Sequence, residues 1–314
     1  MPDPVYSLVI PVYNEEETLP ALEQRLNELL AQMDGPGEVI FVDDGSTDGS
    51  WRLIAGIVER DPRFRAVRFS RNFGHQVAIT AGLDHAAGAA VIVMDADLQD
   101  PPEVVLEMAA RWREGFDIVY AVREERSGET RFKQFTAAVF YRFFRRLTDI
   151  EIPIDVGDFR LVDRRALGAF RSMRESNRYV RGMFSWIGFR QVGVRYRRAP
   201  RYAGATKYPL RKMLKFAADG IVSFSNVPLR VALQAGFAVS GLAFAFGVAA
   251  LVAKLAGLYR VSGLASLAIV TAFLGGMQLI VLGVMGEYIA RIHDEVKNRP
   301  LYIVRETIGV GGTS

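Results

Sequence analysis

Residues 89–100 read AAVIVMDADLQD, an apolar run that ends abruptly in carboxylates. A short apolar run bounded by polar residues is typical of a strand that is buried on both faces of a sheet. Asp95 and Asp97 stand two residues apart, and on an extended segment such side chains share a face. Paired carboxylate oxygens suit a hard divalent cation such as Mg²⁺ or Mn²⁺. A solvated turn is the alternative for an isolated Asp-x-Asp.

Similar apolar runs lie on both sides of this segment and alternate with helical patterns. Helix-like stretches include residues 18–33 and 50–59. This alternation predicts an α/β fold, with a mostly parallel sheet and helices on both faces. Strands are expected at residues 6–12, 39–42, 66–69, 90–94 and 118–122.

Polar clusters follow four of these predicted strands. Ligands of parallel sheets bind outside the carboxyl ends of the strands, so the clusters predict one site at that edge of the sheet. Gln99 could add an amide oxygen to the metal ligands there. The clusters are residues 13–15, 43–46, 70–72 and 95–97.

Composition narrows the class of protein. Of 314 residues, 50% are hydrophobic and 24% are charged, which excludes a disordered or collagen-like chain. The absence of cysteine excludes disulfide scaffolds, cysteine–zinc sites and thiol nucleophiles. The mean hydropathy of +0.13 is high for a soluble domain, because apolar residues are concentrated toward the C-terminus.

Two uncharged stretches, residues 231–253 and 261–286, account for that hydropathy. About 20 apolar residues cross a bilayer as a helix, and the segment that joins the two stretches is short. We therefore expect a two-helix transmembrane hairpin at residues 229–287 and a cytoplasmic tail at residues 288–314. Two buried core helices are the alternative, although uncharged core stretches rarely exceed about 14 residues.

Basic residues predict the orientation of this hairpin. Eight Lys or Arg flank its two ends, whereas the joining loop carries Lys254 and Arg260. The positive-inside rule therefore places both flanks, and with them residues 1–228, in the cytoplasm. The N-terminal residues do not resemble a signal peptide.

Two amphipathic helices are expected beside the hairpin, at residues 132–147 and 209–224. Each carries Phe or Leu on one face and Lys or Arg on the other, which suits a membrane interface and also an ordinary surface helix. Residues 190–215 hold nine Lys or Arg and no Asp or Glu. Beside a membrane segment, this basic block predicts binding to lipid headgroups or a lipid phosphate rather than to nucleic acid.

Several segments resemble those of known enzymes. The chain resembles the family 2 glycosyltransferases and, within them, the polyprenyl-phosphate glycosyltransferases, which include dolichyl-phosphate mannose synthases. Together with the hairpin, the segments PRYAGATKY and GEYIARIHDEVKNRPLY look most like those of bacterial undecaprenyl-phosphate glucosyltransferases. The segments are IPVYNEEETL (10–19), VDDGSTDGS (42–50), SRNFGHQVAITAGLDHA (70–86), DADLQDPPE (95–103), GDFRLVDRRAL (157–167), PRYAGATKY (200–208) and GEYIARIHDEVKNRPLY (286–302).

The resemblance implies a GT-A, Rossmann-like domain that binds a nucleotide sugar. The implied reaction is metal-dependent, inverting transfer of a single sugar to polyprenyl phosphate for cell-envelope glycosylation. UDP-glucose and undecaprenyl phosphate are the expected substrates, and GDP-mannose, UDP-GlcNAc or a UDP-aminoarabinose type of sugar are alternative donors. The implied location is the bacterial inner membrane, with the catalytic domain in the cytoplasm.

The resemblance also assigns roles to residues of this sequence. Asp44 would contact the nucleotide base, and Asp43 is a second candidate for that contact. Arg71 and Gly74 are further pocket candidates. Arg201 and Lys207 would meet the lipid phosphate or the donor diphosphate, with lipid headgroups as the alternative. The metal would be held by Asp95, Asp97 and Gln99. The nucleotide-sugar pocket would be formed by Pro11, Tyr13, Glu15, Asp44, Asp95, Ala96, Asp97 and Arg123.

Asp158 and Asp97 are the expected catalytic carboxylates, and Asp158 could be the general base. The second pKa of a phosphate monoester is about 6, so the attacking oxygen is mostly ionised at neutral pH and Asp158 could instead orient the sugar or the acceptor. Asp155 is the alternative carboxylate, and a structural cap is the alternative role for either. His75 and His85 are expected to serve structure or a polar pocket.

Alternative functions would require different sequence features. A processive polysaccharide synthase would need more membrane helices and a Gln-x-x-Arg-Trp motif, and the sequence has neither. Transfer to a lipid hydroxyl would require Asp158 as a true base. An inactive membrane-anchored partner or scaffold is the alternative from another class, and it would not bind a nucleotide sugar. Small residues in the hairpin are compatible with a homo-oligomer.

Overall fold

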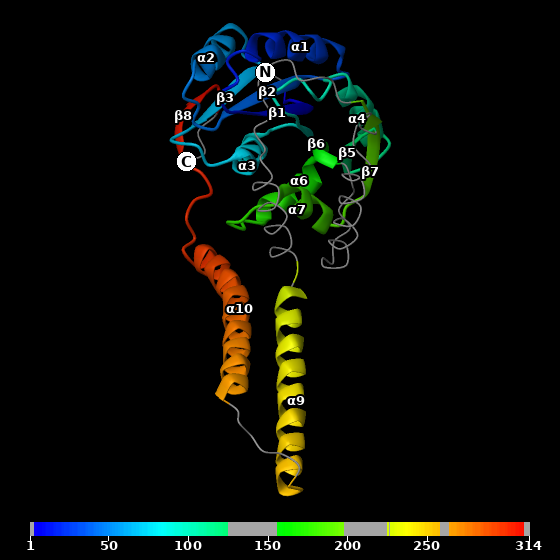
Figure 1. The fold of residues 1–314 in the computed structure, drawn as a ribbon. Helices are drawn as coiled ribbons and strands as arrows, with labels where there is room; N and C mark the ends of the chain where they lie inside the picture. The colour runs from blue at the N-terminus through cyan, green and yellow to red at the C-terminus, as the bar shows by residue number, and fades with distance from the viewer. Residues whose placement is uncertain (1–2, 125–155, 198–224, 226, 258–263, 311–314) are drawn as a thin grey trace.

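An α/β domain with two long helices projecting from one side makes up the protein (Figure 1). The computed structural model describes residues 3–124, 156–197, 225, 227–257 and 264–310. Several expected features lie outside the described residues: the amphipathic helices at 132–147 and 209–224, and Asp155, Arg201 and Lys207.

An eight-stranded sheet forms the centre of the domain, in the order β7-β5-β6-β4-β1-β2-β3-β8. Strands β1 to β4 run parallel, whereas β6 lies antiparallel between β4 and β5, and β8 lies antiparallel beside β3. The mixed, mainly parallel sheet confirms the expected α/β class. The strands are β1 (Tyr6–Val12), β2 (Gly37–Asp43), β3 (Phe64–Phe69), β4 (Ala90–Val93), β5 (Ile118–Arg123), β6 (Val156–Asp163), β7 (Gln191–Tyr196) and β8 (Val304–Ile308).

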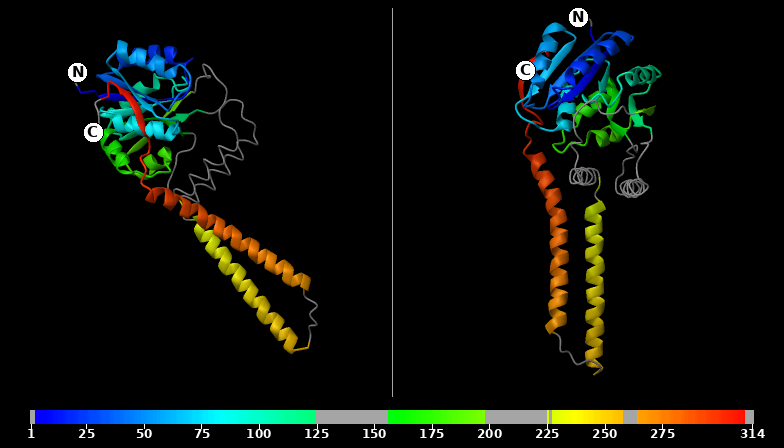
Figure 2. Two further views of the ribbon diagram at one scale, coloured as in Figure 1. Left: turned by 90° about the vertical axis from the view of Figure 1, so that its left-hand side faces the viewer. Right: turned by 45° about the horizontal axis from the view of Figure 1, so that its top comes forward.

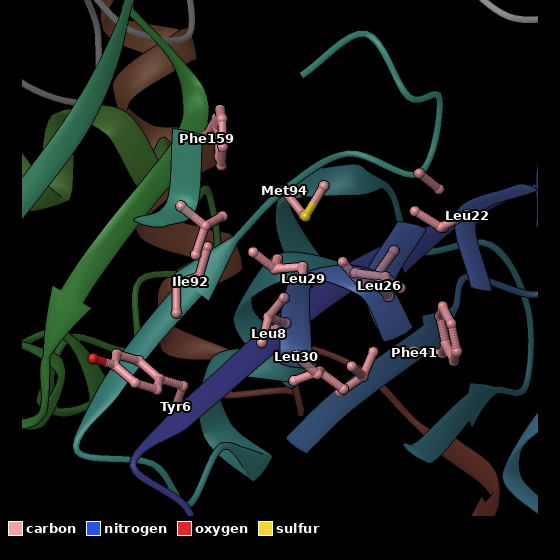
Figure 3. Close-up of a cluster of buried hydrophobic side chains, with 14 of the residues drawn as sticks. Tyr6, Leu8, Leu22, Leu26, Leu29, Leu30, Phe41, Ile92, Met94 and Phe159 are labelled. Carbon is pink, nitrogen blue, oxygen red and sulfur yellow. The ribbon is translucent and has the colours of Figure 1, made fainter. Parts of the chain in front are cut away.

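Helices cover both faces of the sheet because successive side chains of a strand point to opposite faces. Leu8 and Ile10 of β1 pack under α1 (Leu19–Gln32), α2 (Ser50–Arg60) and α4 (Val104–Arg113). Val9 packs in the other core, under α3 (His75–His85), α6 (Arg164–Ser172) and α7 (Val180–Trp186). Figure 3 shows the first core, where the leucines of α1 meet β1, β2 and β4.

Strand β6 is the main element that the sequence patterns did not predict. Its residues include Asp158, Arg160 and Asp163, which interrupt the apolar pattern of a buried strand. Arg160 is nonetheless 3% exposed and donates to the carbonyl oxygen of Gly157 at 2.9 Å. Hydrogen bonds of this kind let a polar sequence form an internal strand.

The two projecting helices are α9 (Val227–Leu255) and α10 (Leu264–Val296). Both are long and apolar enough to cross a membrane, and the apolar windows that qualify them are not buried in the protein. This exposure argues against the alternative of two buried core helices. Helix α10 also continues beyond the expected end at residue 286, because the polar segment that follows keeps helical pairing, as between Glu287 and Arg291 (3.5 Å).

A cytoplasmic tail was expected at residues 288–314. Of its described residues, those that follow α10 return to the α/β domain. Strand β8 pairs with β3 at the edge of the sheet, as Figure 2 shows. The Tyr302 ring stacks on Phe69 with centroids 5.1 Å apart, and its hydroxyl donates to Asp84 Oδ2 at 3.1 Å. The amide of Ser176 donates to Glu295 Oε2 at 2.9 Å. These contacts hold the end of α10 and the segment that follows it against the domain.

Substitution of Tyr302 tests this docking. We expect Tyr302→Ala to lower the free energy of unfolding by about 2–4 kcal/mol, because it removes a partly buried aromatic ring. Tyr302→Phe keeps the ring and loses only the hydrogen bond to Asp84, so we expect the free energy of unfolding to fall by about 1 kcal/mol. Denaturant unfolding of the detergent-solubilised protein measures both values. An Ala variant as stable as the wild type would contradict the docking.

Candidate active site

The carboxyl ends of the parallel strands bring the expected polar clusters to one edge of the sheet. Strands β1, β2 and β4 end there at Val12, Asp43 and Val93. Strand β6 runs in the opposite direction and pairs Val93 with Arg160. Its first residues therefore lie at the same edge, and this register places Asp158 beside Asp95.

The loop after β4 carries the two carboxylates of the expected metal site. The main-chain amide of Gln99 donates to Asp97 Oδ1 at 3.1 Å. Between them Leu98 has a φ of 57°, a conformation that costs a non-glycine residue about 1–3 kcal/mol and is often found at functional sites. The tight turn that results holds Asp95 and Asp97 in one short loop.

Asp95 fits a role as a metal ligand. Its Oδ1 atom is buried, accepts no hydrogen bond from the residues that the structure describes, and faces His75 Nε2 at 3.4 Å. An acceptor oxygen in this position suits a hard cation. The described residues contain no group of three His, Asp or Glu that forms a metal site by itself.

Asp158 is bound by side chains from two helices. Arg181 of α7 grips both oxygens, with Nε 2.8 Å from Oδ1 and Nη2 3.0 Å from Oδ2. Two residues at the start of α3 approach Oδ2: Gln76 Nε2 donates to it at 3.2 Å, and His75 Nε2 lies 3.4 Å away. His75 thus lies between Asp95 and Asp158, whereas His85 ends the same helix.

The charges of this cluster shift one another's pKa values. Burial alone would raise the pKa of Asp158, but the charge of Arg181 and the bonds from His75 and Arg181 hold it well below its ordinary range. Burial would lower the pKa of His75, but Asp95 and Asp158 raise it to about 9. Burial raises the pKa of Asp95, against the opposing charge of His75. Asp158 is therefore a weak proton acceptor in this arrangement.

Asp44 joins the end of β2 to the loop before α3. Its carboxylate accepts from the amides of Phe73, at 2.6 Å, and Gly74, at 3.0 Å. Gly74 has a φ of 104°, which favours glycine at this turn. Asp43 accepts from the amide of Ser46 at 3.1 Å. Both aspartates thus shape the loops on the side of the site expected to receive the nucleotide base.

The remaining candidates for the nucleotide-sugar pocket differ in the exposure of their side chains. Tyr13 is 40% exposed at the sheet edge, whereas Pro11 and Ala96 are buried. The main-chain amide of Glu15 donates to Ser50 Oγ at 2.9 Å. Of these residues, Tyr13 presents the most side-chain surface to a ligand.

Arg123 reaches the same edge from the end of β5. Its Nε donates to the hydroxyl of Tyr196 at 3.3 Å, and that hydroxyl donates to Asp100, which is 1% exposed. A Cβ on Gly157 would lie 2.9 Å from Arg123 Nη2, so glycine at this position leaves room for the guanidinium. The cation expected to face phosphates thus lies against the start of β6 and is connected through Tyr196 to Asp100.

Four residues of the site had no expected role: Gln76, Asp100, Arg181 and Tyr196. Gln76 directly follows the strand-end motif SRNFGH, so its position offered a signal. Asp100 stands close behind Asp-x-Asp in the sequence. Arg181 and Tyr196 lie in segments without a motif, and only the packing of α7 and β7 brings them to the site.

A Rossmann-like sheet with clustered carboxylates and arginines at its carboxyl edge is typical of enzymes that act on nucleotide-linked substrates. The family model described as Glycosyl transferase family 2 matches residues 7–170. The chain therefore belongs to glycosyl transferase family 2. It is a glycosyltransferase, as the sequence motifs predicted.

Relatives match the chain over nearly its whole length. The Uncharacterized glycosyltransferase YkcC of Bacillus subtilis (strain 168) is 50% identical, over 97% of this chain and 94% of its own. The Uncharacterized glycosyltransferase sll0501 of Synechocystis sp. (strain ATCC 27184 / PCC 6803 / Kazusa) is 46% identical, over 97% and 96%. The SfII prophage-derived bactoprenol glucosyl transferase of Shigella flexneri is 41% identical, over 96% and 97%.

A hydroxyl deletion tests the Arg123–Tyr196–Asp100 connection. We expect Tyr196→Phe to lower the free energy of unfolding by about 1–3 kcal/mol, because the buried carboxylate of Asp100 loses a donor. Thermal or denaturant unfolding in detergent measures this change. Tyr120→Phe, the same deletion on β5, is the control and should have a smaller effect. Equal effects of the two variants would contradict a special role for Tyr196.

Proposed function

We propose that this enzyme transfers glucose from UDP-glucose to undecaprenyl phosphate at the cytoplasmic face of the membrane. The observation that carries the proposal is the carboxylate and arginine cluster around Asp95, Asp158 and Arg181, on a domain joined to an apolar helical hairpin. A relative named bactoprenol glucosyl transferase, 41% identical over 96% of this chain, supports the acceptor and the sugar.

On the donor side, Asp95 and Asp97 would hold Mg²⁺ or Mn²⁺, with Gln99 as a further ligand. A bound divalent cation would neutralise the charge that develops on the diphosphate leaving group. Arg123 would face the same diphosphate as a fixed cation, since guanidinium groups bind phosphate oxygens with two parallel hydrogen bonds. Asp44 and Tyr13 would line the nucleotide side of the pocket.

On the acceptor side, Asp158 would orient the reactants rather than remove a proton. A carboxylate with a depressed pKa is a poor base, and both of its oxygens already accept hydrogen bonds. The phosphate of the lipid needs no base, because its second pKa is about 6. Arg201 and Lys207, which lie outside the described residues, would bind this phosphate.

Helices α9 and α10 would span the bilayer and hold the site at the membrane surface. The proposed domain division is then a catalytic domain at residues 1–228, a hairpin at residues 229–287 and a C-terminal segment that returns to the catalytic domain. A lipid-linked phosphate could reach the donor from the headgroup layer, so the acceptor would not have to leave the bilayer.

The central experiment is an assay of the purified protein with UDP-glucose, undecaprenyl phosphate and Mg²⁺ or Mn²⁺. We expect a lipid-linked sugar that disappears with EDTA. Asp95→Asn and Asp97→Asn should lower turnover about 10²–10³-fold, the usual cost of losing a transition-state stabiliser. Glu28→Gln on the exposed side of α1 is the control and should leave turnover unchanged.

Three outcomes of this assay would count against parts of the proposal. A product that forms equally well without metal would contradict the metal site. A product formed only from GDP-mannose, UDP-GlcNAc or a UDP-aminoarabinose donor would contradict glucose. No lipid-linked product with any of these donors, together with no nucleotide-sugar binding, would favour the inactive scaffold.

Single cysteines test the membrane topology, because the natural chain has none. Leu255→Cys, at the far end of α9 and 80% exposed, should react with a membrane-impermeant maleimide in intact spheroplasts. Glu17→Cys in the catalytic domain is the matched control and should react only after permeabilisation. The reverse labelling pattern would contradict a cytoplasmic catalytic domain.

A further inference from the structure

Arg181 and Asp158 form a pair whose geometry is defined by two contacts. The guanidinium places Nε 2.8 Å from Oδ1 and Nη2 3.0 Å from Oδ2 of the carboxylate. A planar fork of this kind specifies the rotation of a carboxylate as well as its position. The Asp158 side chain is almost fully buried, so water cannot easily replace this partner.

Gln76 connects this pair to the fold. Its Nε2 atom donates to Asp158 Oδ2 at 3.2 Å, and its Oε1 atom accepts from the amide of Val180 at 3.0 Å. Val180 is the first residue of α7, and its amide has no partner within the helix. One amide side chain therefore fixes both Asp158 and the helical turn that carries Arg181.

Packing leaves α7 little freedom to move away from Asp158. Val180, Met183 and Phe184 are buried, and the Phe184 ring stacks on Phe170 of α6 with centroids 4.5 Å apart. Arg160 of β6 is also buried, and its Cζ atom lies 4.9 Å from the centroid of the Phe184 ring. The backbone of Arg181 is thus positioned by the core that lies under α3, α6 and α7, independently of any ligand.

We propose that Arg181 is a positioning residue that holds Asp158 in one orientation toward the acceptor phosphate, and that Gln76 fixes Arg181 for this role. The inference rests on the proposed function, because it concerns the acceptor side of that site. Arg181 acts through Asp158 and does not itself bind the donor. Asp158, in turn, orients the attacking oxygen without accepting its proton.

Kinetics of two variants test the inference. Arg181→Lys keeps the charge but loses the fork, so kcat should fall about 10–100-fold, while the KM for UDP-glucose stays within about threefold. Gln76→Ala should lower kcat about 3–10-fold by loosening the same carboxylate. Arg60→Lys is the matched control: it alters an exposed ion pair with Glu23 on α1 (2.9 Å) and should leave kcat unchanged.

A double variant separates positioning from direct contact with substrate. If Arg181 acts through Asp158, the variant that combines Arg181→Lys with Asp158→Asn should be no slower than Asp158→Asn alone. Losses that multiply would show that Arg181 contacts a substrate, and they would overturn the inference. Asp158→Asn should also retain activity with the wild-type pH–rate profile, whereas loss of one limb of that profile would identify a general base and overturn the orienting role.

Two further measurements test whether Arg181 and Gln76 have a purely structural role and whether the proposed acceptor is wrong. A parallel rise in the KM for UDP-glucose and fall in the unfolding midpoint in both variants would indicate general damage and overturn the inference. If the wild type releases UDP from UDP-glucose but forms no lipid-linked sugar, the proposed acceptor is wrong. The same variants are then compared by UDP release, where an undiminished rate in both would overturn the positioning role and a lowered rate would support it.

Discussion

The carboxylate of Asp158 is almost completely buried, and a buried charge is tolerated only when it is paired and hydrogen-bonded. Arg181 supplies the charge, and Gln76 and His75 supply further contacts. These partners come from α3 and α7, two helices on the same face of the sheet. The need to compensate one carboxylate therefore joins β6, α3 and α7 at the edge where Asp95 lies.

The antiparallel insertion of β6 makes this arrangement possible. A parallel strand next to β4 would carry its first residues to the opposite edge of the sheet. Because β6 runs the other way, Asp158 at its start lies beside Asp95 at the end of β4. Asp95 and Asp158 thus share His75, whose Nε2 atom lies 3.4 Å from one oxygen of each carboxylate.

The C-terminal segment closes the side of the same sheet that is formed by β3. Strand β8 pairs with β3 and covers an edge that would otherwise expose unpaired backbone groups. The Tyr302 hydroxyl reaches Asp84 of α3, the helix that carries His75 and Gln76 at its other end. The segment that follows the hairpin is therefore attached, through Tyr302, to the helix that carries His75 and Gln76.

Local patterns in the sequence determined a large part of this protein. Apolar runs identified β1 to β5, the spacing of Asp95 and Asp97 identified the expected metal loop, and two uncharged stretches identified α9 and α10, because each signal lies within a few neighbouring residues. Strands β6, β7 and β8 and the contacts of Gln76 and Arg181 with Asp158 were decided only by the tertiary structure. Their signals depend on pairing between distant segments: the polar residues of β6 become compatible with a buried strand only when Arg181, from α7, balances the charge of Asp158. The motifs thus identified Asp95, Asp97 and Asp158 as candidate site residues, whereas the packing of α7 against β6 decided how Asp158 is held.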